Sequence, residues 1–257
     1  MRFTLNKHVK WRVDKLDILI CDCKKMVDLK LPLRYEEFMK KLERGIEEEK
    51  LGLEEKKVFS DFKKMNLISK LNIRKIKKEE FNSTVDILDN RLGKNRVRGK
   101  EFLFEKFEKY PEFFIGIFLD KELIGMVCGF PREDYLLISE IAVDKRFCGR
   151  GFGKRLVEIF EKTAKRKYGQ INVGAEDNVI GFYEKLNYKP FLLIQFKEKD
   201  YKKEDFDDFH IIKEYNFDSK NLMIEAEINK CNLNLLNKLR DKYPKAHFQY
   251  IFTKKIV

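Results

Sequence analysis

The sequence predicts an α/β protein of the α+β kind, with a mixed, mostly antiparallel central sheet flanked by helices. Residues 135–189 supply the first observation, because a strand, a glycine-rich loop, a helix, a second strand and another helix follow one another there. A hairpin of two apolar strands, residues 113–119 and 123–130, precedes them. A strand, strand, helix, strand series, residues 210–256, comes after them. Apolar residues repeat every second position in strands and about every 3.6 positions in helices, which distinguishes the elements.

The composition indicates a folded protein with an ion-rich surface. Hydrophobic residues make up 43% of the 257 residues and charged residues 38%, so the chain can bury a core. The net charge is +12 at pH 7, but basic and acidic residues are mixed along the whole chain. We therefore interpret the excess as a solvated surface that also attracts an anionic ligand, and we disfavour nucleic acid as a partner.

The cysteines and the apolar runs bear on location and metal binding. Five cysteines, an odd number, and no secretory signal in the first ten residues are typical of the reducing cytoplasm, where we expect the protein. No apolar run approaches the roughly 20 residues of a membrane span, so no membrane contact is expected. The close pair Cys21 and Cys23 lacks a second Cys or His pair at zinc spacing, so no metal is expected.

Residues 1–71 are predicted to form a small α/β module. Strands at 16–21 and 26–31 form a hairpin, and helices follow at 35–48 and 54–65. This order is similar to small winged-helix modules, including the peptide-binding PqqD-like ones, on pattern alone. A helical appendage that covers the main domain is the alternative. The first helix is too acidic for a nucleic-acid groove, which favours a peptide or intramolecular role.

The main domain is predicted over residues 72–196. It begins with a strand at 71–76 and two helices at 81–92 and 102–110. The loop at 91–100 is rich in basic residues, which indicates an acidic acceptor, contact with a ligand's phosphates, or a solvated loop. The basic residues are Arg91, Lys94, Arg96, Arg98 and Lys100.

Residues 197–257 are predicted to form a C-terminal extension. A charged stretch, residues 197–208, leads into the strand, strand, helix, strand series. The extension can complete the sheet, cover an acceptor cleft or form a homodimer interface, and the sequence leaves these three roles open.

A glycine loop at the centre of the chain predicts a phosphate site. Gly149, Gly151 and Gly153 alternate just before an amphipathic helix, and Arg150 and Lys154 add cations. Glycine allows positive φ, so backbone N–H groups can point into one concavity, and the helix N-terminus adds about half a positive charge. The loop lacks the Gly-Lys-Ser/Thr of a P-loop and the glycine spacing of the dinucleotide-binding fingerprint.

Features on both sides of this loop suggest a family. Residues 141–143 (Ile-Ala-Val) end the strand before the loop, and Phe182 and Tyr183 follow the second strand, with Asn187-Tyr188 after them. This series resembles the GNAT superfamily of N-acetyltransferases over residues 72–196. That family has an aliphatic-Ala-Val strand end, Arg/Gln-x-x-Gly-x-Gly/Ala, a helix, a strand and Phe-Tyr-x-x-x-Gly-Phe. The resemblance implies the GNAT fold and acetyl-CoA as co-substrate.

The resemblance also implies a role for each matching residue. The main chain of Ile141, Ala142 and Val143 would pair with the pantetheine arm of acetyl-CoA. Tyr183 would be the general acid that protonates the departing thiolate, and Glu140 the base that takes the amine proton. The backbone of the loop would bind the pyrophosphate. Its residues are Cys148, Gly149, Arg150, Gly151, Phe152, Gly153 and Lys154.

The catalytic assignments have simpler alternatives. An acid on an apolar strand is costly to bury without purpose, but Glu140 can also be an exposed strand end or the partner of a lysine. Tyr183 can also be a packed aromatic residue beside Phe182. Acyl transfer nevertheless requires a group that takes the amine proton and one that stabilises the thiolate, and these two residues supply both.

Two positions depart from the family pattern. Cys148 stands where the family has Arg or Gln, in the register that fits Gly151, whereas Arg146 starts an alternative register. Asn178, a further candidate for cofactor binding, lies five residues before Tyr183, and the commonest family spacing is seven.

We therefore predict an acetyl-CoA-dependent N-acetyltransferase that acts directly on a primary amine of a small molecule, protein or peptide. The alternative is a regulatory or binding protein. In that case the GNAT domain would sense acetyl-CoA or act as a scaffold, and the N-terminal module would bind a peptide or DNA. The acceptor amine is left open.

Overall fold

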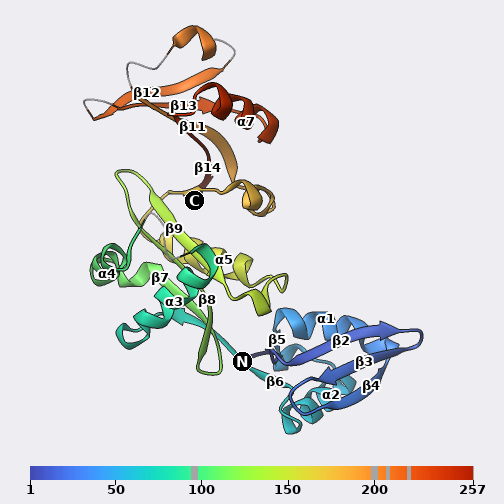
Figure 1. Ribbon diagram of the computed structural model, residues 1–257. Helices are drawn as coiled ribbons and strands as arrows, with labels where there is room; N and C mark the ends of the chain where they lie inside the picture. Colours follow the sequence, from blue (N-terminus) through green and yellow to red (C-terminus); the bar gives the residue numbers. More distant parts are fainter. Residues whose placement is uncertain (94–97, 198–201, 207–208, 219–220, 257) are drawn as a thin grey trace. The chain divides into compact units, whose positions relative to one another are not determined.

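The computed structural model describes residues 1–93, 98–197, 202–206, 209–218 and 221–256. The chain forms two compact units, which we describe separately (Figure 1). Unit 1 consists of Met1–Cys128 and Glu140–Phe160, and unit 2 consists of Gly129–Ser139 and Glu161–Val257. Strands β8 and β9 belong in part to each unit, because the chain passes between the units within them.

Unit 1 contains a sheet with the strand order β9-β8-β7-β6-β1-β5. Its pairs from β8 to β5 are antiparallel, as predicted for most of the sheet. The predicted hairpin is confirmed, and β7 is buried along its whole length. The strands are β1 (Arg2–Leu5), β5 (Ile46–Glu47), β6 (Ile68–Lys75), β7 (Phe114–Leu119), β8 (Glu122–Pro131) and β9 (Leu136–Val143).

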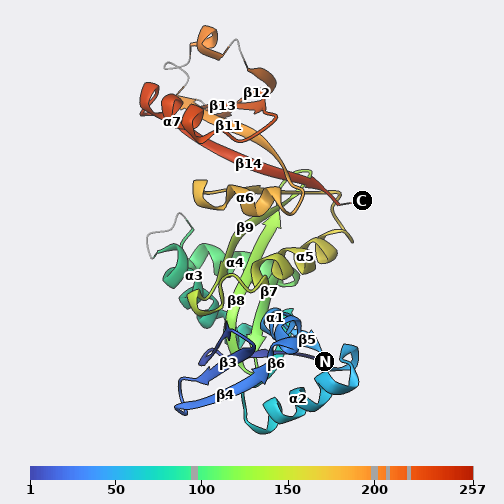
Figure 2. The same ribbon diagram turned by 90° about the vertical axis from the view of Figure 1, so that its right-hand side faces the viewer.

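Helices cover both faces of β7 and β8, which explains why β7 is apolar throughout. In Figure 2, α3 (Phe81–Leu92) and α4 (Lys100–Lys109) lie on the side opposite α5 (Phe152–Ala164). The predicted helix at 81–92 is confirmed. Of the predicted basic loop, residues 94–97 lie outside the described residues, and Arg91 belongs to the last turn of α3.

The N-terminal module contains a second, three-stranded antiparallel sheet in the order β2-β3-β4. The predicted hairpin and the second helix are confirmed, but the prediction of a helix over 35–48 is wrong at its end. Helix α1 stops at Arg44 because Gly45 takes a left-handed φ of 88°. The elements are β2 (Val9–Asp14), β3 (Asp17–Asp22), β4 (Val27–Pro32), α1 (Glu36–Arg44) and α2 (Leu53–Lys64).

The module's first strand belongs to the larger sheet of unit 1. β1 was not predicted, and it pairs antiparallel with β6, with Leu5 opposite Ile68. Strand β6 runs from residue 68 to residue 75, through the predicted boundary at residues 71 and 72. The module and the strands that follow are therefore joined by main-chain hydrogen bonds as well as by the chain.

Unit 2 contains a sheet with the strand order β9-β10-β14-β11-β13-β12. Only β9 and β10 are parallel among these pairs, with Leu136–Ile138 beside Ile171–Val173. The predicted β-β-α-β extension is confirmed, and its last strand enters the sheet between β10 and β11. The elements are β10 (Gln170–Gly174), α6 (Ile180–Glu184), β11 (Lys189–Lys197), β12 (His210–Asp218), β13 (Asn221–Glu227), α7 (Leu233–Lys242) and β14 (His247–Lys255).

The charged stretch predicted at 197–208 lies partly outside the described residues. Residues 198–201 and 207–208 are not described, and a short 3₁₀ helix, Lys203–Phe206, lies between them. Within the described part of the chain, the helices are too short or too polar to cross a bilayer.

Replacing Asn232 by Ala is expected to destabilise α7. The Asn232 side chain accepts a hydrogen bond from the Leu235 N–H at 3.1 Å and so caps the helix. The free energy of unfolding should fall by about 1 kcal/mol, measured by chemical denaturation. Asn234→Ala, a change at an exposed position two residues further on, is the control. Equal midpoints for the two variants would contradict the capping role.

Candidate cofactor and catalytic site

The glycine loop presents bare backbone at the start of α5. Gly149 and Gly151 adopt φ of 79° and 78°, a left-handed conformation that favours glycine. A Cβ atom built at either position would meet no atom within 4 Å. Gly153 already lies inside the helix. Space therefore remains beside the loop, next to the positive end of a 13-residue helix, where an anionic group is favoured.

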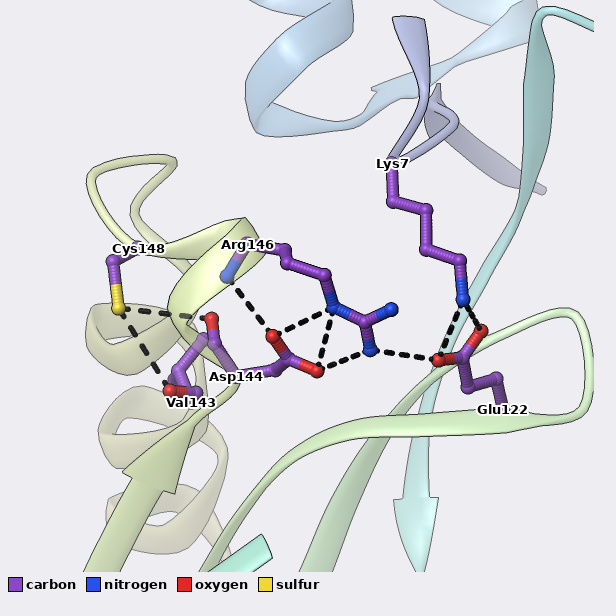
Figure 3. A network of polar contacts seen from close by, with 6 residues as sticks. All are labelled: Lys7, Glu122, Val143, Asp144, Arg146 and Cys148. Carbon is purple, nitrogen blue, oxygen red and sulfur yellow. Dashed lines mark hydrogen bonds and ion pairs between the residues drawn. The ribbon is translucent and has the colours of Figure 1, made fainter. Parts of the chain in front are cut away.

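A network of ions holds the first part of this loop (Figure 3). The Asp144 carboxylate accepts a hydrogen bond from the Arg146 N–H at 2.9 Å and from its guanidinium. Arg146 also donates to Glu122 at 2.9 Å, and Lys7 donates to the same carboxylate at 3.0 Å. The hydrogen bond with Arg146 lowers the pKa of Asp144, so this carboxylate stays ionised at neutral pH.

Cys148, at the predicted Arg or Gln position of the family motif, contacts two main-chain oxygens. Its thiol lies 3.7 Å from the Val143 carbonyl oxygen and 3.6 Å from that of Asp144, and it is the donor (Figure 3). The strand end and the loop, both predicted as cofactor-binding, are thus in contact within unit 1.

The loop's other side chains point in different directions. Phe152 is buried, and Lys154 is exposed beside Glu158, 3.8 Å away. Arg150 is 6% exposed and donates a hydrogen bond to the main chain of Leu5 in the N-terminal module. The loop backbone therefore faces open space, while the Arg150 side chain turns into the protein.

Strand β9 carries Glu140 on its buried face. Burial alternates along the strand, with Ala142 on the same face and Ile141 and Val143 half-buried on the other. Glu140 is 8% exposed, so its carboxylate is largely withdrawn from water.

Tyr183 is buried in an aromatic cluster of unit 2. Its ring lies 5.0 Å from Phe182, 5.8 Å from Tyr188 and 5.5 Å from Phe252, between centroids. Burial, and next the charge of Glu176, raise the pKa of Tyr183 above its ordinary value. The phenol is therefore protonated at neutral pH, the state that a general acid needs. The packing beside Phe182 is also the one that a purely structural aromatic residue would have.

Asn178 lies on an exposed turn that lines an open pocket of about 410 Å³. Asp177 next to it forms an ion pair with Arg240 of α7, with a shortest distance of 2.6 Å. Sequence reasoning did not identify Arg240, because it lies 63 residues from its partner and belongs to no motif. The pocket is lined by Ala175, Glu176, Asp177, Asn178, Arg240, His247, Phe248 and Gln249.

The predicted residues are thus divided between the units. Glu140, the strand end at 141–143 and the loop at 148–154 belong to unit 1. Tyr183 and Asn178 belong to unit 2. Their assignment to one site therefore depends on the family pattern as well as on the contacts within each unit.

The family comparison matches the segment that carries these residues. Residues 73–188 match the model of the acetyltransferase (GNAT) family. This match assigns the segment, as distinct from the rest of the chain, to the GNAT acetyltransferase family. A comparison with curated proteins found no match.

Several solved structures are similar to this chain. A putative acetyltransferase from Pyrococcus horikoshii is 22% identical over 57% of this chain and 50% of its own, with a TM-score of 0.41. Ard1 from Thermoplasma volcanium is 18% identical over 62% and 99%, with a TM-score of 0.42. An N-acetyltransferase from Staphylococcus aureus Mu50 is 14% identical over 74% and 100%, with a TM-score of 0.44. The alignment spans half the length of the first of these proteins.

Proposed function

We propose that the protein is an acetyl-CoA-dependent N-acetyltransferase that transfers the acetyl group directly to a primary amine. The observation that carries this proposal is the open glycine loop at the start of α5, inside the segment that matches the family. A pyrophosphate fits there because Gly149 and Gly151 leave space where other residues would place a Cβ atom. In this proposal residues 148–154 bind the pyrophosphate, the main chain of 141–143 binds the pantetheine arm, and Asn178 adds a further contact.

Acetyl-CoA supplies an activated thioester, and the chain supplies the proton transfers. The attacking amine must be neutral, so Glu140 takes its proton, directly or through a water molecule. The thiolate must be stabilised as it leaves, so Tyr183 donates its phenolic proton. The raised pKa of Tyr183 keeps that proton in place until the thiolate forms. An N–H group of strand β9 can stabilise the negative charge on the carbonyl oxygen.

Replacing Tyr183 by Phe tests this mechanism. Turnover should fall by roughly 100-fold, the loss of a general acid, while the Kd for acetyl-CoA changes less than twofold because the loop is untouched. Turnover is measured as CoA release with the best acceptor from a panel of amines and peptides, and Kd is measured by calorimetry.

Tyr188→Phe is the matched control for this experiment. It removes another buried hydroxyl, from a ring whose centroid lies 5.8 Å from that of Tyr183. If Tyr183→Phe weakens cofactor binding more than turnover, or if the two variants lose equal turnover, Tyr183 is not the acid. If wild type does not bind acetyl-CoA, the cofactor assignment is wrong as well.

A further inference from the structure

Two arginine side chains run from the glycine loop and α5 into the N-terminal module. The Arg150 guanidinium donates to the Leu5 carbonyl oxygen at 3.2 Å, across 145 residues of sequence. The Arg155 guanidinium donates to the Gly45 carbonyl oxygen at 3.0 Å, across 110 residues. Both contacts lie inside unit 1, so the module is attached to the loop itself.

Arg150 is a buried cation, which indicates more than a surface contact. Its guanidinium carbon lies 5.2 Å from the Phe147 ring centroid, and its Nε atom lies 3.9 Å from a Glu43 carboxylate oxygen. Loss of solvent lowers the pKa of both Arg150 and Arg155. Withdrawing a cation from water is costly unless partners are fixed in place, so these partners are needed for the loop to hold this arrangement.

The partners in the module are fixed because each stands at the end of a regular element. Leu5 ends strand β1 and is paired with Ile68 of β6. Gly45 ends helix α1 in a left-handed conformation, and a Cβ atom there would stand 3.0 Å from Arg155 Nη1. Both acceptors are main-chain oxygens, so they move only if β1 or α1 moves.

The same module also reaches the chain before the loop indirectly, through Glu122 of β8. Lys7 follows β1 and reaches Glu122, which holds Arg146 (Figure 3). Arg146 and Arg150 lie on either side of Cys148 and Gly149 in the sequence. The module is therefore linked to the chain before the first left-handed glycine by exposed ion pairs, and to the chain after it by the buried Arg150 contact.

We propose that the N-terminal module contributes to the cofactor site. Arg150 and Arg155 are positioning residues whose contacts with the module hold the pyrophosphate-binding loop in its binding conformation. This inference rests on the proposed function, because it takes acetyl-CoA as the ligand of the loop. A loop held in its binding conformation loses less entropy when the ligand binds. Docking of the module and cofactor affinity must then be linked in both directions.

Arg150→Gln is the first test, by calorimetry with CoA. The change removes the cation but retains a polar side chain, and CoA should bind about tenfold more weakly, within the usual range of coupling between sites. Pantetheine, which lacks the pyrophosphate, should bind both proteins equally. Lys57→Gln, which removes one charge from an exposed position of the same module, is the matched control and should leave Kd unchanged.

Gly45→Ala is the second test, because it changes the module without changing the loop. The new methyl group would press on Leu71 as well as on Arg155, and the positive φ would be strained, so CoA affinity should fall in the same direction. Hydrogen exchange keeps the proposal testable if this variant is unstable. In cofactor-free Arg150→Gln, residues 148–154 should exchange faster while β1 and β6 keep their protection.

The outcomes separate the two proposals. Absence of CoA binding to wild type would overturn the proposed function. Wild-type binding together with an unchanged Kd in Arg150→Gln, or an equal loss of CoA and pantetheine, would overturn the positioning role alone. Unchanged exchange at residues 148–154 would overturn it as well.

Discussion

Gly151→Asp is expected to abolish acetyl-CoA binding, with Kd raised at least about 100-fold, the cost of losing charge-assisted hydrogen bonds. A carboxylate at this position would accept hydrogen bonds from the N–H groups that bind the pyrophosphate, and it would repel the charge of the pyrophosphate. The left-handed φ of 78° adds strain of about 1–2 kcal/mol for any residue with a Cβ atom. Titration calorimetry with acetyl-CoA measures the effect.

Gly151→Asn separates charge from backbone strain in this experiment. Asn has nearly the same shape as Asp, is neutral, and tolerates the left-handed region better than most residues. We therefore expect a smaller loss of affinity for Asn than for Asp. The Asp variant should remain folded, because a carboxylate at a helix N-terminus is stabilising. Binding of acetyl-CoA to the Asp variant as tight as to wild type would show that the phosphate site lies elsewhere.

Phe114→Ala is expected to lower the free energy of unfolding by about 3–5 kcal/mol, as for large aromatic residues in cores. Phe114 is fully buried in the cluster that α3 and α4 form with the sheet. Its ring meets Phe107 edge-on, 5.2 Å between centroids. Deleting it leaves a cavity in the cluster that also contains Ala142 of β9. Denaturant unfolding followed by circular dichroism measures the loss.

Phe104→Ala provides the comparison for that measurement. Phe104 also contacts Phe107, with centroids 6.4 Å apart, but it is 37% exposed. Water already reaches this side chain, so its removal leaves little cavity and should cost clearly less. Equal losses for the two variants would mean that Phe114 is not part of a tightly packed core.

Local patterns were sufficient to predict most of the elements. The helix at 81–92 and the helix after the glycine loop were predicted because their apolar residues share one face. The end of α1 was missed because the apolar spacing continues to Ile46, whereas Gly45 turns the backbone out of the helix. Strand β1 was missed because it has four residues, too few for a clear alternation.

The order of the strands in the sheet could not be predicted from local sequence patterns. Strand β1 lies beside β6, and β14 lies between β10 and β11. In the sequence, β1 is far from β6, and β14 is far from both of its neighbours. Such pairings are made by main-chain groups, which are the same in every residue. Burial of the apolar faces, a property of the folded chain, selects which strands pair.

The sequence by itself determined the nature of the loop. Alternating glycines between a strand and an amphipathic helix specify a backbone that can approach a phosphate, because only glycine takes the required φ without strain. Only the tertiary structure decided where the loop's cations point. Arg150 looks like a phosphate ligand in the sequence, yet its side chain donates to the Leu5 carbonyl in the N-terminal module. No local pattern could predict this contact, because the acceptor is a main-chain oxygen 145 residues away and every residue has such an oxygen.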